Sequence, residues 1–97
     1  MEEHVYYLYI MASPSGTLYV GMTNSLIRRV DQHKRGEIDG FSKEHGCKKL
    51  VYYEIGRDVR VVIAREKQIK NWRRDKKEFL IRQINPHWND LSETIFG

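Results

Sequence analysis

The chain contains few cysteines and prolines, and it has no long apolar segment. Its 97 residues include one cysteine and two prolines. The lone thiol of Cys47 cannot form an internal disulfide, which favours a reducing compartment, and a zinc site based on cysteine pairs is excluded. The longest uncharged run, 5–27, is broken by the turn-forming stretch 13–16, so no segment supplies the roughly 20 apolar residues of a membrane span. We therefore expect a cytoplasmic protein without a membrane segment.

Length and charge narrow the function further. A chain of 97 residues is enough for one domain with a buried core, and we expect one domain over 1–97. Lysine and arginine exceed aspartate and glutamate by four. The excess is concentrated in 57–82, where ten basic side chains face four acidic ones. Such a patch favours a polyanion, nucleic acid first and an acidic membrane surface second, although a solvated helix face is the alternative. The side chains expected to contact phosphates are Lys67, Lys70, Arg73, Arg74, Lys76 and Lys77.

Residue patterns predict three strands and three helices. Runs of aromatic and β-branched residues indicate strands, the spacing of apolar residues by three and four indicates helices, and 36–46 is expected to be a polar loop. The predicted strands are 5–11, 18–22 and 50–55, and the predicted helices are 26–35, 59–72 and 76–84. This β-β-α-β-α-α order predicts an α+β fold in which helices cover a small sheet.

The apolar side chains of the last two helices are expected to face the core. They are Val59, Val62, Ile63, Ile69 and Trp72 in one helix, and Phe79, Leu80 and Ile84 in the next. Four further apolar residues in the C-terminal tail, Trp88, Leu91, Ile95 and Phe96, are expected to dock on the domain.

Three features do not follow from the fold alone. Glu66 falls inside the apolar stripe of its helix with no obvious cation on that face, which is costly unless the carboxylate is paired or holds a cation. Arg29 and His33 share a helix face because they are four residues apart. In the predicted hairpin, Tyr9 lies opposite Gly21 and diagonal to Tyr19, so that two phenols converge above a glycine.

Each feature has a structural alternative. Glu66 could form a buried salt bridge or lie at an edge, the Arg29–His33 face could be solvated, and the tyrosines could be core aromatics. Together, however, they supply phenols, a guanidinium, an imidazole and an inward carboxylate. That set suits phosphodiester hydrolysis, in which a carboxylate holds a divalent metal, arginine binds the phosphate oxygens, and a phenol or imidazole relays a proton.

The order and spacing of these residues resemble a known family. Tyr7-Leu8-Tyr9, nine intervening residues, and Tyr19-Val20-Gly21 resemble the two-part signature of GIY-YIG nucleases, with Tyr7, Leu8 and Val20 departing from its letters. Arg29, His33, Glu66 and Asn85 follow in the order of the family. The resemblance covers about 5–91 and is greatest to short, stand-alone bacterial members.

The resemblance implies a three-stranded antiparallel sheet flanked by helices and hydrolysis of DNA with Mg²⁺ or Mn²⁺. By position, Glu66 would bind the metal and Arg29 would stabilise the transition state. Tyr19 would lie nearest the attacking water and Tyr9 would support it. The auxiliary residues would be His33 and Asn85.

Three functions stay open at this point. The chain could be an endonuclease acting on duplex or branched DNA in repair or recombination, a nucleic-acid-binding module with little or no activity, or a nuclease subunit that needs a protein partner. The retained tyrosines, arginine and glutamate favour an enzyme over a binding module. The sequence does not distinguish the two kinds of enzyme, and it leaves the oligomeric state open.

Overall fold

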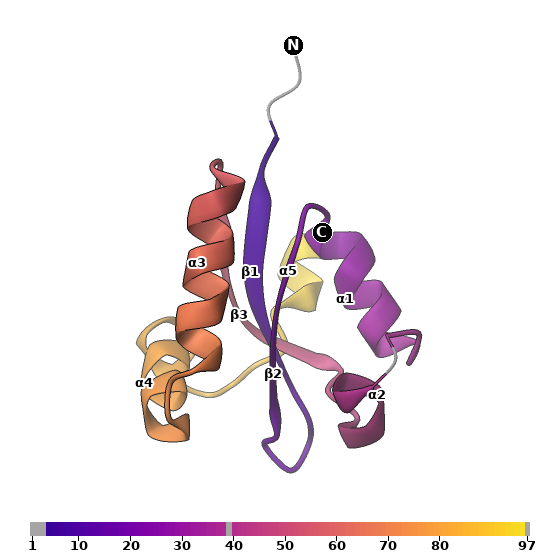
Figure 1. Ribbon diagram of the computed structural model, residues 1–97. Coiled ribbons are helices and arrows are strands. Elements are labelled where there is room, and N and C mark those ends of the chain that lie inside the picture. The colour runs from indigo at the N-terminus through magenta and orange to yellow at the C-terminus, as the bar shows by residue number, and fades with distance from the viewer. Residues whose placement is uncertain (1–3, 39, 97) are drawn as a thin grey trace.

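The computed structural model describes residues 4–38 and 40–96. Three antiparallel strands form one sheet in the order β2-β1-β3 (Figure 1). They are β1 (Tyr6–Ala12), β2 (Leu18–Thr23) and β3 (Lys49–Gly56). The predicted α+β fold with a three-stranded antiparallel sheet is confirmed.

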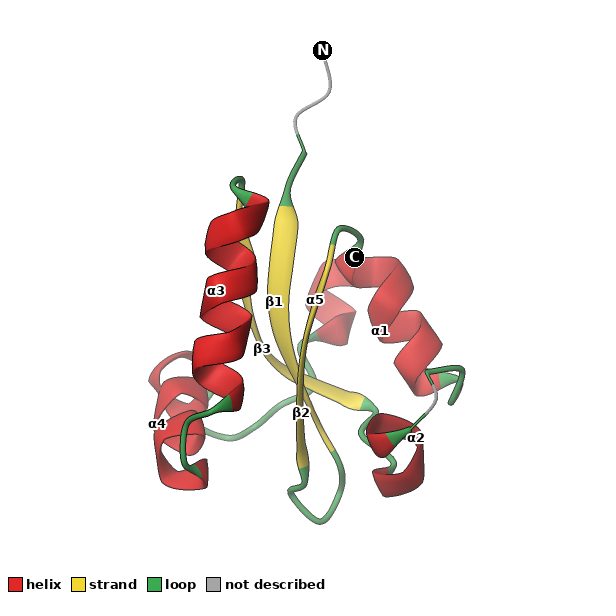
Figure 2. Ribbon diagram, viewed as in Figure 1, coloured by secondary structure: helices red, strands yellow, loops and turns green. Residues whose placement is uncertain are grey.

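Helices cover both faces of the sheet. In the view of Figure 2, α3 (Val59–Lys70) and α4 (Arg74–Ile84) lie on one side, while α1 (Leu26–Lys34), α2 (Phe41–His45) and α5 (Ser92–Phe96) lie on the other. The short helices α2 and α5 are corrections to the sequence prediction, which placed α2 in a polar loop and α5 in an irregular tail. Helices of five residues carry too little periodicity to be read from a sequence.

The central strand β1 separates two cores. Side chains alternate along a strand, so Leu8 and Ile10 face α3 and α4, while Tyr9 and Met11 face α1. All residues from Leu8 to Ala12 are buried, because this strand is covered on both faces.

Helix α3 is positioned by a cap and by an ion pair with the sheet. Asp58 is the N-cap residue, and its side chain accepts a hydrogen bond from the Arg60 backbone N–H at 3.0 Å. The guanidinium of Arg65 donates two hydrogen bonds to Glu54 of β3, at 3.1 and 3.0 Å. This bidentate pair fixes the rotation of α3 about its axis, and thereby the direction of its other side chains.

The apolar faces of α3 and α4 are narrower than predicted. Ile63, Phe79 and Ile84 were expected to face inward, but they are 37%, 63% and 60% exposed. Ile81, which was not assigned to the core, is fully buried in α4. The reason is geometric, because each helix touches a small sheet along one line and no further layer covers its flanks.

The C-terminal segment docks through polar and apolar contacts. Asp90 accepts hydrogen bonds from Lys34 at 2.5 Å and from the Leu50 backbone N–H at 3.2 Å, which ties the segment to α1 and β3. Leu91 and Ile95 pack on the core that contains Tyr9, as predicted, whereas Phe96 stays exposed. Among the described residues, no helix has the length and apolar character needed to cross a membrane.

The register of the hairpin places a glycine where a side chain would not fit. Tyr9 pairs with Gly21, as predicted. A Cβ atom at Gly21 would lie 2.6 Å from the Tyr9 hydroxyl oxygen and 2.7 Å from the ring carbon that bears it. Since Tyr9 is fully buried and cannot swing aside, a residue without a side chain is required at position 21.

We expect Gly21→Ala to lower the free energy of unfolding by about 1–3 kcal/mol, the usual range for overpacking a close contact. Urea denaturation followed by circular dichroism would measure it. In the Tyr9→Leu background the ring is gone, so the alanine should cost less than it does alone, and the two changes should be non-additive. An equal cost in both backgrounds would contradict the clash.

Candidate functional site

Two tyrosines and a histidine meet above Gly21. The ring centroids of Tyr9 and Tyr19 are 6.2 Å apart, and His33 of α1 lies 5.4 Å from Tyr9 and 5.0 Å from Tyr19. The predicted convergence of the two phenols is therefore what the structure shows. The hairpin register brings the tyrosines together, and α1 adds the imidazole from a segment more than ten residues further along the chain.

His33 is part of the interior rather than a solvated helix flank. Its side chain is 2% exposed, and its Nε2 lies 2.8 Å from the Tyr9 hydroxyl oxygen. Arg29, one turn earlier on α1, is half-buried and lies close enough to influence the charges of both Tyr9 and His33. Arg29 and His33 thus share a face, as predicted, and that face is turned toward the tyrosines.

Burial keeps the inner pair of this cluster neutral. Burial raises the pKa of Tyr9 above its ordinary value, and the neighbouring Tyr19 raises it further, while Arg29 opposes both effects. Burial and the nearby Arg29 lower the pKa of His33 to about 4. At neutral pH, Tyr9 therefore carries its proton and His33 is an uncharged imidazole.

Glu66 of α3 has a cation close by, which the sequence analysis did not expect. Its side chain is 13% exposed, and the Nζ of Lys70, one turn later, lies 2.8 Å from its Oε1. The salt-bridge alternative for Glu66 is thus part of the structure. The pair lacks hydrogen-bond geometry, however, and this Oε1 is buried with no hydrogen-bond partner among the described residues.

The Oε1 of Glu66 combines a cation at ion-pair distance with the absence of a hydrogen bond among the described residues. A buried carboxylate oxygen without a hydrogen bond is unfavourable, and a metal ion or its bound water would satisfy it. No group of three or more metal-ligating side chains occurs among the described residues. A metal here would therefore be held by one carboxylate and water, as Mg²⁺ often is.

A groove joins the tyrosine cluster to α3 and α4. It has a volume of about 240 Å³ and is lined by Tyr19 of β2, Phe41 of α2, Lys70 of α3 and Lys77 of α4, together with Leu18 and Val20. Tyr19 is half-buried and lines this groove, whereas Tyr9 is fully buried and does not line it. Lys70 lines the groove and pairs with Glu66, so it connects the carboxylate to the same opening.

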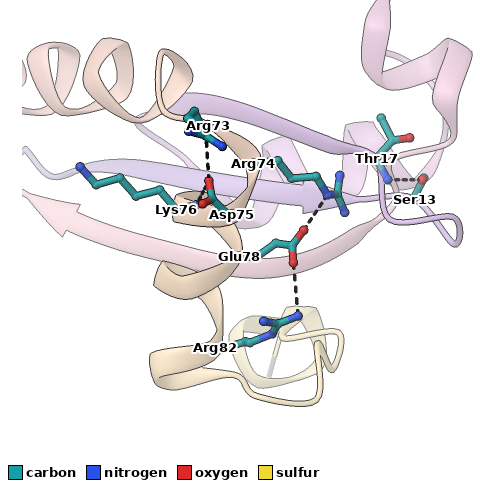
Figure 3. A network of polar contacts seen from close by, with 8 residues as sticks. All are labelled: Ser13, Thr17, Arg73, Arg74, Asp75, Lys76, Glu78 and Arg82. Atoms are coloured by element: carbon teal, nitrogen blue, oxygen red, sulfur yellow. Dashed lines mark hydrogen bonds and ion pairs between the residues drawn. The ribbon is translucent and has the colours of Figure 1, made fainter.

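Some of the predicted phosphate-binding side chains already form ion pairs within the protein. Ion pairs join Arg74 to Glu78 and Arg73 to Asp75 at the start of α4, at 2.6 and 3.8 Å (Figure 3). Glu78 also holds Arg82, so this side of α4 is a chain of exposed ion pairs. Such pairs contribute little to stability and leave the cations able to meet phosphate.

Lys77 differs from its neighbours. It is half-buried in the groove, and burial together with the nearby Arg74 lowers its pKa. No acidic side chain lies within ion-pairing distance of it among the described residues. A cation that is partly desolvated and unneutralised is a better phosphate ligand than a solvated one, because less water must be removed on binding.

The sequence analysis did not identify an aromatic component of this surface. Lys76 lies over the Trp72 ring, 4.4 Å from its centroid, and Arg65 lies 5.2 Å from it. Trp72 and Phe79 line a wide hollow of about 650 Å³ with Arg73 and Lys76. Trp72 had been assigned to the core on helical spacing, and nothing in the spacing showed that its ring would also meet two cations.

Asn85 does not join the tyrosine cluster. Its side-chain NH₂ donates to the Val51 and Asn89 carbonyl oxygens at 3.0 and 2.9 Å, and its Oδ1 accepts from the Asn89 N–H at 3.0 Å. These bonds close the turn after α4 onto β3. Every polar atom of the buried side chain therefore has a structural partner, and the auxiliary catalytic role predicted from the resemblance has no contact in the structure to support it.

Ser42 is a site residue that sequence analysis missed. It lies in α2, in the segment predicted to be a polar loop, and its Oγ is 2.7 Å from Nδ1 of His33. Serine in a glycine-containing loop carries no pattern that distinguishes it from a solvated residue. Only the tertiary fold shows that it is buried against the histidine.

The chain matches the family model of the GIY-YIG catalytic domain over residues 5–78. It is also similar along most of its length to bacterial proteins named UPF0213. It is 31% identical to one from Bacillus pumilus, with 87% of this chain and 86% of that protein covered. It is 31% identical to one from Pectobacterium carotovorum, with 99% and 100% covered, and 32% identical to one from Staphylococcus aureus, with 86% and 99% covered.

A solved structure has the same fold. The solution structure of a UPF0213 protein from Bacillus halodurans matches with a TM-score of 0.58 and covers 89% of this chain and 92% of its own. At 24% sequence identity this likeness concerns the fold alone. It agrees with the three-stranded sheet and flanking helices described above.

Acid should destabilise the protein through His33. The unfolded chain takes up a proton near pH 6.5, while the folded imidazole resists it until about pH 4. The unfolded state therefore binds more protons in this window, and the free energy of unfolding should fall by about 3 kcal/mol as the pH drops through it. Urea denaturation at half-unit pH steps would measure the loss.

The matched control for this pH effect is His33→Gln, which is less stable at neutral pH but has no imidazole to titrate. Carboxylates with a lowered pKa, such as Glu54 and Asp90, lose their contribution to the free energy of unfolding at still lower pH. They do so in both proteins, so the difference between the two stability curves isolates the contribution of His33. Parallel curves between pH 6.5 and 4.5 would contradict a buried neutral histidine.

The bonds of Asn85 indicate a structural residue. Asn85→Ala removes three hydrogen bonds and leaves buried backbone groups unpaired, so the free energy of unfolding should fall by roughly 2–4 kcal/mol. Asn85→Asp keeps the acceptor but loses both donors, and should be destabilised as well. Thermal denaturation would measure both. If Asn85→Ala loses catalytic rate without losing stability, the residue is catalytic instead.

Proposed function

The chain belongs to the GIY-YIG family, a family of nucleases, and from that premise we propose that it is a divalent-metal-dependent endonuclease that hydrolyses DNA phosphodiester bonds. The observation that carries the proposal is the groove. It brings one half-buried phenol, Tyr19, together with two cations, Lys70 and Lys77. The Tyr19 ring in turn lies 5.0 Å from His33, the partner of the buried Tyr9. A phosphodiester entering the groove would meet a proton acceptor and positive charge at the same place.

Glu66 would hold the metal. Its buried Oε1 has no hydrogen bond, and a hydrated Mg²⁺ or Mn²⁺ ion is the kind of ligand that would satisfy it. When bound, the ion would supply charge to the phosphate and to the leaving oxygen. Since Lys70 lies 2.8 Å from the same oxygen, its ammonium would have to move toward the groove as the metal binds, which places it near the incoming phosphate.

The other residues would orient the reactants and stabilise charge. Tyr19 is the phenol that substrate can reach, and we assign it to orient the attacking water and to relay a proton inward. As it takes the proton of the water, its own proton passes to Tyr9, and the proton of Tyr9 passes to the neutral imidazole of His33. Arg29 is a fixed cation beside the two tyrosines and matches the charge that spreads over the phosphate oxygens. Lys77 would bind a flanking phosphate, helped by its partial desolvation.

The DNA surface would extend from the groove over α3 and α4. Exposed lysines and arginines on these helices would contact the phosphates of duplex or branched DNA, and such contacts make affinity fall with salt. Preference for branched DNA would fit a role in repair or recombination.

One observation favours a second candidate function. The Lys70 ammonium already occupies a position beside Glu66 that a metal would take. If this internal cation excludes the metal, the groove and the basic helices would bind nucleic acid without cutting it. The enzyme and the binding module share the same DNA surface, so DNA binding alone does not distinguish them.

Cleavage of duplex, nicked, flapped and four-way DNA with Mg²⁺ or Mn²⁺ would test the proposal. We expect cleavage that Glu66→Ala and Arg29→Ala abolish, because both remove charge stabilisation used in the transition state. Tyr19→Phe keeps the ring and deletes the hydroxyl, and should slow cleavage by about 10²–10⁴-fold if the phenol relays a proton. DNA affinity of these variants should change far less than their rates.

The matched control is Tyr53→Phe. Tyr53 is a half-buried phenol on β3 that pairs with Tyr9 from the opposite strand, so the variant makes the same chemical change on the other side of Tyr9. Its cleavage rate should equal that of the unmodified protein. If the protein binds DNA but cleaves none of the four substrates in the presence of metal, the endonuclease proposal is wrong and the nucleic-acid-binding function is supported.

A further inference from the structure

Both ring nitrogens of His33 have a buried partner. Nε2 lies 2.8 Å from the Tyr9 hydroxyl oxygen, and Nδ1 lies 2.7 Å from Oγ of Ser42. A neutral imidazole carries one N–H, so one nitrogen donates and the other accepts. Which nitrogen donates decides the direction in which the Tyr9 hydroxyl points.

The surroundings of Ser42 determine that direction. Its Oγ donates to the Cys47 carbonyl oxygen at 3.4 Å, and a carbonyl can only accept. With the serine hydrogen directed to this carbonyl, across a contact that is long for a hydrogen bond, the serine oxygen accepts the shorter 2.7 Å bond from Nδ1–H of His33. It follows that Nε2 is unprotonated and that Tyr9 donates its hydrogen to it. The opposite tautomer would leave the Cys47 carbonyl without the serine hydrogen and would turn the Tyr9 hydrogen outward, to the side of Tyr19 and Arg29.

The chain holds this arrangement rigidly. The Cys47 N–H donates to the Ser42 carbonyl at 3.0 Å, so backbone and side chain of the serine are both tied to the same residue. Gly40 and Gly46, on either side of α2, have φ angles of 87° and 65°, which glycine adopts without strain. The short helix is thereby closed at both ends around a buried serine.

We propose that Ser42, backed by the Cys47 carbonyl, is a positioning residue that holds His33 in the Nδ1–H tautomer and keeps the Tyr9 hydroxyl directed inward. For its effect on rate the inference rests on the proposed nuclease function. The tautomer itself does not depend on that function.

The consequence reaches the groove. With its hydrogen committed to His33, Tyr9 has only lone pairs to offer Tyr19 and Arg29 beside it. Groups on the groove side can then donate to Tyr9, and a Tyr19 hydroxyl that does so turns its own lone pairs toward the groove. Along the chain of hydrogen bonds, Tyr9 donates to His33, His33 donates to Ser42, and Ser42 donates to the Cys47 carbonyl. The direction of the chain is set at its end, because a carbonyl oxygen can accept a hydrogen bond but cannot donate one. Ser42 thus keeps Nε2 of His33 free to accept a proton, so that Tyr19 can take the proton of the water while its own passes to Tyr9 and that of Tyr9 to His33.

Nitrogen-15 NMR of the histidine rings would test the tautomer directly, with His33→Gln identifying the resonances. In the unmodified protein His33 should be a single Nδ1–H tautomer. Ser42→Ala removes the acceptor and should produce a mixture or the Nε2–H form. Cys47→Ala is the matched control, because it removes a buried neighbouring side chain but keeps the carbonyl, and its His33 should stay Nδ1–H.

Cleavage rates give the second readout. Ser42→Ala should lower kcat by about tenfold, the effect of one hydrogen bond in a preorganised site, with little change in DNA affinity. Ser42→Thr keeps the hydroxyl and should restore both the tautomer and most of the rate. Cys47→Ala should keep the rate of the folded protein.

An Nε2–H tautomer in the unmodified protein overturns the inference, and this measurement remains decisive if Ser42→Ala does not fold. An unchanged tautomer in a folded Ser42→Ala also overturns it, as does a tautomer change that leaves kcat unaltered. If the unmodified protein cleaves no DNA, the proposed function fails, and the tautomer of His33 still decides whether Ser42 positions the histidine.

Discussion

The site depends on the missing side chain at Gly21. Because nothing projects from β2 opposite Tyr9, the phenol lies flat against the sheet and is completely buried. From there it reaches His33 of α1, and its ring supports Tyr19 at the groove. A methyl group at position 21 would push the phenol away from the histidine. The close contact between the Tyr9 ring and the backbone of Gly21 therefore sets the positions of Tyr9, His33 and Tyr19 relative to one another.

The candidate site combines a neutral interior with a charged rim. Tyr9 and His33 are held uncharged by burial, while Lys70 and Lys77 line the opening, Glu66 pairs with Lys70, and Arg29 lies beside Tyr9 and His33. Charge is costly to bury, so a small domain can place only hydrogen-bonding groups behind its site and must keep the ions at the edge. This division suits a reaction in which phosphate meets charge at the surface and a proton is handled by oriented phenols.

The sequence analysis predicted features that depend on residues close together in the chain, and it missed most features that depend on packing between distant segments. The strands, the hairpin register and the face shared by Arg29 and His33 depend on neighbours close in the chain, and all were predicted. The orientation of exposed helix flanks was not, because Ile63, Phe79 and Ile84 carry the apolar signal of core residues but face no other layer. The Lys70 partner of Glu66 lies one helical turn away and was overlooked because the stripe was assigned to apolar packing alone.

By itself, the sequence determined the α+β class, the pairing of Tyr9 with Gly21 and the family to which the chain belongs, since motif spacing and strand alternation are local properties. Only the tertiary structure decided that Ser42 meets His33, that Asn85 closes a turn, and that Lys70 and Lys77 share a groove with Tyr19. These contacts join side chains that come from separate helices and strands. Their side chains meet because packing brings the elements together, and no spacing along the chain encodes a distance across the fold.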